Sequence, residues 1–596
     1  MENETENDAK ITKSLENPAG PKAIEVKTAP VSHIVYKVAD IPSFPATLVF
    51  ALQVALQVVS GAVTNSILLS DAICGTSHVT AKLMSTNMFM CGLTTFIQAV
   101  IGVRLPIFQT PSIYYVVPII SRADLPDWAC TNQDYVSSSN QTMSAFNGTT
   151  LSPPETGDDI WRGRLLEICG VLMIVSILHA LIGATGLGGQ IAKVIGPLTI
   201  APAVVVMILK FLDTILKLVF IHLGVAVLTL ATLLILTTYM ANVLVPIPYW
   251  TRSHGWKMTK SKFLRTYAVL ISIALGWLLC HILTVTGALP DDPDSLQYNA
   301  RTDNKGDTVE LAKWFYFPYP GQFGVPRFSV AIFFGLIVAM LSSVIDSLAD
   351  YKIAARVCQI PKVPPHGTNR GLLIEGCCSI LSGAFGAGMA TSTNISVTGS
   401  LAISGVTSRR VFQAAGLLLM FLGVVGKIGA VLVIIPKPVI GAVLIVILGS
   451  VTGVLIAELN DFEMKRPRNC MTIGLAMLLG YMIPKMIIEY HEILDTGIPE
   501  LNNVIRAMFG TPLFVAGVVA CFLDNTLPGG RGQKPDPEDD KGQTSDETAP
   551  AHRLPYVHDY FTNCKWTRFC PFLPGFQHNV KKDVLISEPT QKLELV

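Results

Sequence analysis

The sequence predicts an all-α polytopic membrane protein with about 14 transmembrane segments. Half of the 596 residues are hydrophobic and only 15% are charged, whereas soluble globular domains carry roughly 25% charged residues. The mean hydropathy of +0.49 indicates the same class. Apolar runs of the roughly 20 residues that cross a bilayer recur along the chain, and they decide the assignment.

Twelve apolar runs reach or approach this length, and two shorter runs are interrupted by polar residues. The long runs are 46–69, 83–103, 165–188, 190–211, 217–239, 266–287, 328–351, 371–389, 411–434, 436–457, 469–488 and 504–524. The short runs, 105–120 and 388–403, are third in the first seven segments and third in the last seven. Short, interrupted segments at matching positions of two halves are typical of a transporter binding site.

Basic connections set the expected orientation. They are Arg104, 252–265, 352–370, Arg409 with Arg410, and 465–468. With 14 segments and a cytoplasmic N-terminus, all of them fall on the cytoplasmic side, as the positive-inside rule requires. The loop 121–164 then lies outside and contains N-glycosylation sequons at Asn140 and Asn147. We therefore expect both termini in the cytoplasm and the protein in the plasma membrane.

Composition divides the chain into three parts. Residues 1–40 form a polar cytoplasmic segment that lacks the apolar core of a secretory signal peptide. Residues 41–526 form the transmembrane part, and the polar, Pro-rich tail 527–596 is expected to be mostly disordered. Cys74 and Cys130 both fall outside and could form a disulfide. A net charge of +1 gives no reason to expect a nucleic-acid partner.

The two short segments supply the candidate substrate-binding residues. In the first, Gln109, Thr110 and Ser112 interrupt the apolar run. The second carries small and hydroxyl residues throughout 386–399 and has no charge. Such a lining suits a neutral or weakly anionic polar solute, although small residues also occur where transmembrane helices pack closely.

Two acids at the end of run 328–351 are candidate cation ligands. Asp346 and Asp350 are four residues apart and so share one helix face. An ionisable residue within a membrane segment is a functional-site hypothesis by default, and carboxylates suit Na⁺ or a proton. The alternative is that Asp350 lies at the cytoplasmic helix end and pairs with Lys352 or Arg356.

Other polar residues within the segments leave more than one interpretation. Gln53 and Gln57 share a face of the first segment and either line the site or hydrogen-bond between helices. Glu375 lies near the cytoplasmic entry of its segment, where Arg370 is a possible partner. His179, in an otherwise apolar run, is interpreted as a core or interfacial histidine.

Several specific stretches resemble one known family. They are RTDNKGDTVELAKWFYFPYPGQFGVP at 301–326, NRGLLIEGCCSILSGAFGAG at 369–388, TSRRV at 407–411 and FLDNTLPG at 522–529. Over about residues 36–530 the chain resembles the nucleobase–ascorbate transporter family, solute carrier family 23, and in particular its sodium-dependent vitamin C transporter branch.

The resemblance implies a fold and a mechanism. It implies two inverted repeats of seven segments, with short strands in segments 3 and 10. Segments 1–4 and 8–11 would form a substrate-carrying core, and segments 5–7 and 12–14 a gate that also forms a homodimer. The core would slide against the gate in an elevator-like movement, with Na⁺ driving uptake of ascorbate.

The same resemblance maps family positions onto this chain. Asp346 stands where the family has Glu, and Asp350 keeps the second acid of the pair. Gln53 is followed by Val54 where the family has Gln-His. Gln109 is kept in segment 3. In the segment 10 signature Gly399 is kept, while Ser396 and Val397 stand in the first two positions.

These observations predict a secondary active transporter: a sodium-coupled symporter of ascorbate or a related small polar molecule. The alternatives are a nucleobase transporter of the same fold and a membrane protein that binds partners without transport. An enzyme is not expected, because the sequence has no Ser/His/Asp arrangement, CxxC pair, HExxH motif or phosphate-binding Gly loop. No cofactor is expected apart from Na⁺ as coupling ion.

Overall fold

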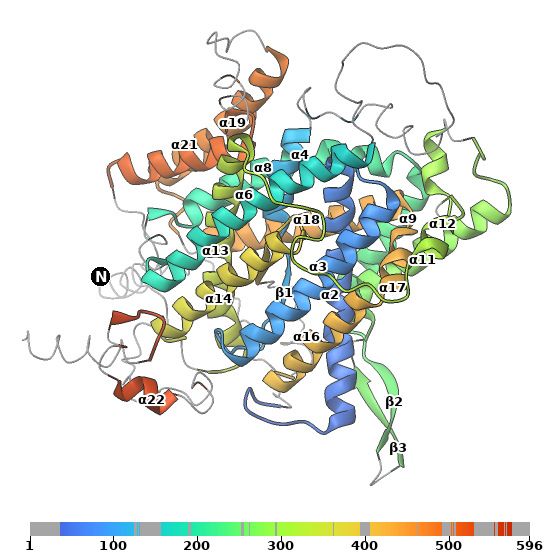
Figure 1. Ribbon diagram of the computed structural model, residues 1–596, viewed down its shortest axis with the longest axis horizontal. Coiled ribbons are helices and arrows are strands. Elements are labelled where there is room, and N and C mark those ends of the chain that lie inside the picture. The colour runs from blue at the N-terminus through green and yellow to red at the C-terminus, as the bar shows by residue number, and fades with distance from the viewer. Residues whose placement is uncertain are drawn as a thin grey trace, which may run out of the picture.

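The computed structural model forms a helical assembly with the short strand β1 (Gln109–Pro111) among its helices (Figure 1). The residues it describes are 36–123, 128, 130, 157–188, 191, 194–251, 255–261, 263–292, 295–304, 306–360, 363–393, 406–460, 462–490, 502, 505, 508–529, 554, 558–564, 567 and 569–574. The sequons at Asn140 and Asn147 lie outside these residues. The same holds for Ser396, Val397 and Gly399.

The described residues of the first half of the chain form helices of different lengths and three short strands. They are α2 (Phe44–Ala72), α3 (Ser77–Val100), β1 (Gln109–Pro111), α4 (Ile113–Ala123), α6 (Gly157–Thr185), α8 (Pro197–Val219), α9 (Leu223–Leu234), η1 (Ile235–Tyr239), β2 (Val245–Thr251), β3 (Gly255–Ser261), α10 (Phe263–Thr266), α11 (Ala268–Val285), η2 (Leu296–Ala300) and α12 (Gly306–Leu311).

The second half also opens with two long helices followed by a short strand. Its elements are α13 (Val330–Val357), α14 (Pro365–Ala384), β4 (Thr391–Thr393), α16 (Arg409–Val424), α17 (Gly426–Val433), α18 (Lys437–Leu459), α19 (Pro467–Glu489), α21 (Pro512–Thr526) and α22 (His558–Asn563). The last of these is a short helix within the C-terminal tail.

Seven helices among the described residues are long and apolar enough to cross a membrane. An eighth span is possible if α17 and α18, which meet at a bend of 92°, count as one. Two further apolar helices, Leu223–Tyr239 and Pro512–Thr526, are shorter. The protein is therefore a multi-pass membrane protein, and the total of about 14 segments stays a prediction.

The helices pack in two sets. In one set α6 packs on α14, α3 on α16, and α13 on both α4 and α6. In the other set α8 packs on α18 and α21, α19 packs on α21, and α9 packs on α11 and α18. Contacts of α13 with α21 and of α2 with α11 join the two sets.

The predicted run 411–434 is a broken helix instead of a continuous one. The segment before α13 forms a β-bridge with it: the Tyr316 backbone amide donates to the Val424 carbonyl (2.8 Å), and the Gly426 amide donates to the Trp314 carbonyl (3.1 Å). Backbone groups at this point bond to the inserted segment, so the helical hydrogen-bond series stops at Val424 and restarts as α17. A long-range contact thus overrides the apolar pattern.

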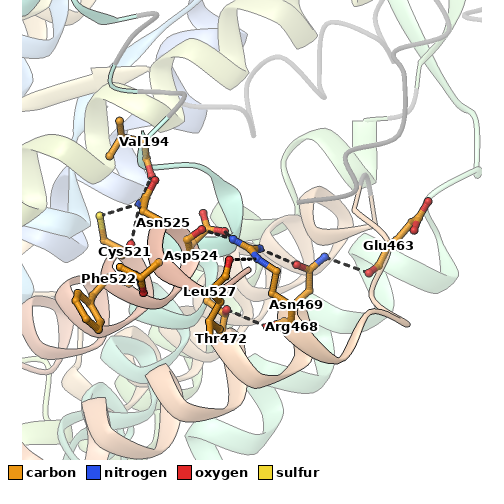
Figure 2. A network of polar contacts seen from close by, with 11 residues as sticks. Val194, Glu463, Arg468, Asn469, Thr472, Cys521, Phe522, Asp524, Asn525 and Leu527 are labelled. Atoms are coloured by element: carbon orange, nitrogen blue, oxygen red, sulfur yellow. Dashed lines mark hydrogen bonds and ion pairs between the residues drawn. The ribbon is translucent and has the colours of Figure 1, made fainter. Parts of the chain in front are cut away.

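A buried ion pair fixes the second set of helices at one end. Arg468, in the first turn of α19, lies 3.0 Å from Asp524 in the last turn of α21, and both side chains are at most 10% exposed. Arg468 Nε also donates to the Leu527 carbonyl, while Asn525 Nδ2 donates to the Val194 carbonyl just before α8 (3.0 Å). Figure 2 shows these residues, from three segments, joined in one network.

Cys74 and Cys130 form a disulfide, with their Cα atoms 5.8 Å apart. This confirms the pairing that the sequence suggested. The bond ties the loop after α2 to the segment after α4, next to Trp128. The Trp128 ring is contacted by the guanidinium groups of Arg122 and Arg164, at 5.5 and 5.3 Å from its centroid.

The disulfide can be tested by counting reactive thiols. Unfolded, unreduced protein should expose 10 of its 12 cysteines to an alkylating reagent, and reduction should expose all of them. Mass spectrometry gives the count. Cys74→Ser should make every remaining cysteine reactive without reduction. Equal labelling of the wild type before and after reduction would contradict the bond.

Candidate functional site

Two short strands from opposite halves of the chain meet inside the first set of helices. β1 and β4 pair antiparallel, with Gln109 opposite Thr393 and Pro111 opposite Thr391. Every residue of both strands is buried. The Ser112 amide extends the pairing by donating to the Ala390 carbonyl (3.0 Å). Extended backbone at membrane depth is tolerated only when it is buried in protein or lines a cavity, so the ribbon marks a candidate site.

Polar side chains of α2 and α3 hold the ribbon in place. Asn65 on α2 donates to the Pro111 carbonyl (2.8 Å). On α3, the Thr95 hydroxyl accepts a hydrogen bond from the backbone N–H of Gln109 (3.0 Å). The Thr94 hydroxyl accepts one from the Thr391 hydroxyl (3.3 Å). A two-stranded ribbon is marginally stable by itself, and these side-chain bonds supply the support that longer strands would give.

Glu375 of α14 is the centre of the polar contacts around the ribbon. Its side chain is completely buried, and its Oε1 atom accepts three hydrogen bonds. The donors are Gln109 Nε2 on β1 (2.8 Å), the Thr393 hydroxyl on β4 (2.6 Å) and the Tyr351 hydroxyl on α13 (3.0 Å). One carboxylate oxygen therefore connects β1, β4, α13 and α14.

The second oxygen of Glu375 faces α6. His179 Nε2 lies 3.8 Å from Glu375 Oε2, and the imidazole is 1% exposed. Close packing of α6 and α14 allows this approach, because a Cβ atom at Gly376 would lie 2.3 Å from the Ala180 amide nitrogen. Small residues are the usual means by which membrane helices approach so closely. His179 and Glu375 thus face each other in the interior, at a distance too long for a hydrogen bond.

Several buried polar atoms around the ribbon have no hydrogen-bond partner among the described residues. They include Gln109 Oε1, Glu375 Oε2, Ser112 Oγ and the Tyr115 hydroxyl. Most buried polar groups in proteins are paired, so a group of orphan atoms needs an explanation. A polar ligand with both donors and acceptors could satisfy an amide oxygen, a carboxylate oxygen and two hydroxyls together.

Comparison with known proteins gives the family. The model of a permease family matches residues 45–489. Human solute carrier family 23 member 2 is 33% identical over 552 residues, covering 91% of this chain and 83% of that protein. The chain belongs to solute carrier family 23. It is a membrane transporter family, and its members are not enzymes.

A plant relative and a solved structure are also similar to this family 23 chain. Nucleobase-ascorbate transporter 8 of Arabidopsis thaliana is 28% identical over 506 residues, covering 83% of this chain and 86% of that protein. The transmembrane domain of the cyanobacterial bicarbonate transporter BicA aligns with a TM-score of 0.47 at 13% identity, over 77% of this chain and all of that domain.

The sequence-predicted residues of segment 3 all lie at the ribbon of this family 23 protein. Gln109 and Thr110 are on β1, and Ser112 follows it, each at most 6% exposed. On α13, Asp346 is partly exposed and Asp350 is 1% exposed. Gln53 lies on α2.

Sequence reasoning missed the centre of this arrangement. Glu375 bonds to Gln109, Thr393 and Tyr351, whereas the sequence had suggested Arg370 as its partner. The rule that singled out the α13 acids, that an ionisable group inside a membrane segment marks a functional site, applies to Glu375 equally. No local pattern indicated that His179 on α6 would face it.

Because α6 and α14 approach closely at Gly376, a methyl group added at this position should destabilise the protein. Gly376→Ala should lower the thermal unfolding midpoint of the purified protein, because overpacking costs about 1–3 kcal/mol. Gly474→Ala on α19 is the matched control, since nothing lies within 4 Å of its Cβ position. Equal midpoints for the two variants would contradict the packing.

Proposed function

We propose that this family 23 transporter is a sodium-coupled symporter of ascorbate or a related small polar molecule, which binds at the β1–β4 ribbon. The observation that supports this most directly is the buried polar centre at Glu375, where two strands and two helices meet. The unpartnered amide, carboxylate and hydroxyl oxygens there can accept hydrogen bonds from the hydroxyl groups of such a solute. The similarity to human solute carrier family 23 member 2 supports membership of the family, but the name of that protein states no substrate.

The coupling ion is assigned to the two acids of α13. Asp346 and Asp350 lie one turn apart on one face, and Asp350 is buried within the membrane helix. Among the described residues, no three His, Cys, Asp or Glu side chains gather as a metal site. A Na⁺ ion would therefore complete its shell with carbonyl and hydroxyl oxygens, which are ligands that hard cations accept.

The two packed sets of helices support an elevator-like movement. The set around α14 and the ribbon would be the moving core, and the set held by Arg468 and Asp524 would be the gate and the dimer contact. Few contacts join the sets, chiefly α13 with α21 and α2 with α11. The orientation with both termini in the cytoplasm and the plasma-membrane location belong to the same proposal.

A nucleobase is the second candidate substrate. Gln109 offers an amide oxygen and Glu375 a carboxylate oxygen, and both can accept from ring and exocyclic N–H groups of a planar base. The similarity to the Arabidopsis protein named nucleobase-ascorbate transporter 8 favours the same candidate.

Uptake into proteoliposomes separates these functions. We expect radiolabelled ascorbate or a nucleobase to accumulate in Na⁺ buffer, with uptake falling to background in choline buffer. Asp346→Asn should reduce uptake in Na⁺ to the choline level, while Glu489→Gln, an exposed acid on α19, should leave it unchanged. Sodium-dependent uptake at the normal rate in Asp346→Asn would contradict the cation assignment.

A second variant tests the ribbon. Glu375→Gln should raise the substrate KM by about 10–100-fold, because a hydrogen bond to a charged group contributes about 1.5–3 kcal/mol. No uptake of any compound by folded wild-type protein would contradict transport and favour a binding or scaffold role.

A further inference from the structure

Three arginines from distant parts of the chain meet at the turn between α3 and β1. Arg370 on α14 donates from Nε to the Gly102 carbonyl (2.8 Å), and Arg409 at the start of α16 donates from Nε to the Arg104 carbonyl (3.0 Å). The charge of Arg104 acts repulsively on both. We call Arg104, Arg370 and Arg409 the arginine cluster.

Arg104 is the member whose charge is least compensated. Its side chain is 9% exposed, and its Nε and Nη1 atoms are buried without a hydrogen-bond partner among the described residues. No described carboxylate forms an ion pair with it. Burying a cation is costly unless it is paired. The unpaired charge of Arg104 would therefore be stabilised by an anionic ligand.

The turn that carries Arg104 is held firmly. Arg104 has a φ of 64°, a left-handed conformation that is uncommon for a residue with a side chain. Gln98 of α3 fixes it: its carbonyl accepts from the Arg104 amide (3.1 Å) and its Oε1 accepts from the Val103 amide (3.0 Å). Gln98 Nε2 in turn donates to the Gly371 carbonyl (2.8 Å). The position of Arg104 in the arginine cluster is therefore fixed by the fold.

We propose that the arginine cluster binds a phosphate group at the end of the protein that is expected to face the cytoplasm. A planar guanidinium matches phosphate oxygens with two parallel N–H donors, and its charge does not depend on pH. The unpartnered Nε and Nη1 donors of Arg104 would bind the phosphate. The negative charge of the phosphate would offset the repulsion among the three arginines. No carboxylate of the substrate site takes part.

The site is separate from the ribbon but linked to it. Between Arg104 and Gln109 the chain runs through the buried side chains of Leu105, Ile107 and Phe108. This apolar stretch separates the arginine cluster from the polar centre at Glu375. A bound phosphate would add a further contact to the turn from which β1 departs, so it would stabilise the set of helices that contains the ribbon.

The phosphate could belong to a lipid headgroup or to a soluble anion, and two experimental arms distinguish them. The full-length protein is placed in phosphatidylcholine nanodiscs, and its thermal unfolding midpoint is measured. One arm adds inorganic phosphate at constant ionic strength. The other replaces part of the lipid with phosphatidylinositol 4,5-bisphosphate and contains no free phosphate. A saturable rise in the midpoint in one arm identifies the source, and no rise in either arm overturns the proposal.

Variants assign the effect to the arginine cluster. Arg104→Asn removes the charge but keeps a residue that tolerates the left-handed backbone, and it should weaken the apparent affinity by about tenfold or more. Arg409→Gln should act in the same direction and decides the question if Arg104→Asn does not fold. Lys465→Gln, an exposed cation expected on the same side, is the control and should change nothing. Equal affinities in wild type and both cluster variants would overturn the proposal, whatever the uptake assays give.

Discussion

The carboxylate of Glu375 is the group on which the arrangement around the ribbon depends. A carboxylate at membrane depth is costly unless hydrogen bonds compensate for the lost water. Here one of its oxygens accepts from β1, β4 and α13 together, so these elements hold their positions through a shared partner. Strands of three residues each could not fix that geometry by their own backbone bonds.

The position of Glu375 also depends on how α14 packs against α6. Glu375 faces His179 across the close contact of α6 and α14, to which Gly376 and Gly183 both contribute. The other set of helices has a comparable anchor in the buried pair of Arg468 and Asp524. Each set therefore has its own buried polar centre, and the contacts between the sets are fewer. That distribution is the observation on which the proposed movement of one set past the other rests.

Buried charge serves different purposes in the two polar regions of the first set. At the ribbon, the donors of Gln109, Thr393 and Tyr351 surround an acid and leave acceptor atoms open to a ligand. At the arginine cluster, carbonyl groups of a tight turn hold two guanidinium groups beside a third. The first region offers oxygens and the second offers N–H donors, so the two proposed sites would take ligands of opposite hydrogen-bonding character.

Local patterns in the sequence determined the class of the protein, the positions of most apolar helices and the interruption at Gln109, Thr110 and Ser112. They did so because helix length, apolar runs and i, i+4 spacing are short-range properties. The family was also recognisable from contiguous stretches such as FLDNTLPG. The tertiary structure decided what those residues meet. Gln109 and Glu375 are 266 positions apart, and the Trp314–Tyr316 segment breaks a helix more than a hundred residues later. Contacts at such separations arise only when the helices pack, and no local pattern encodes them.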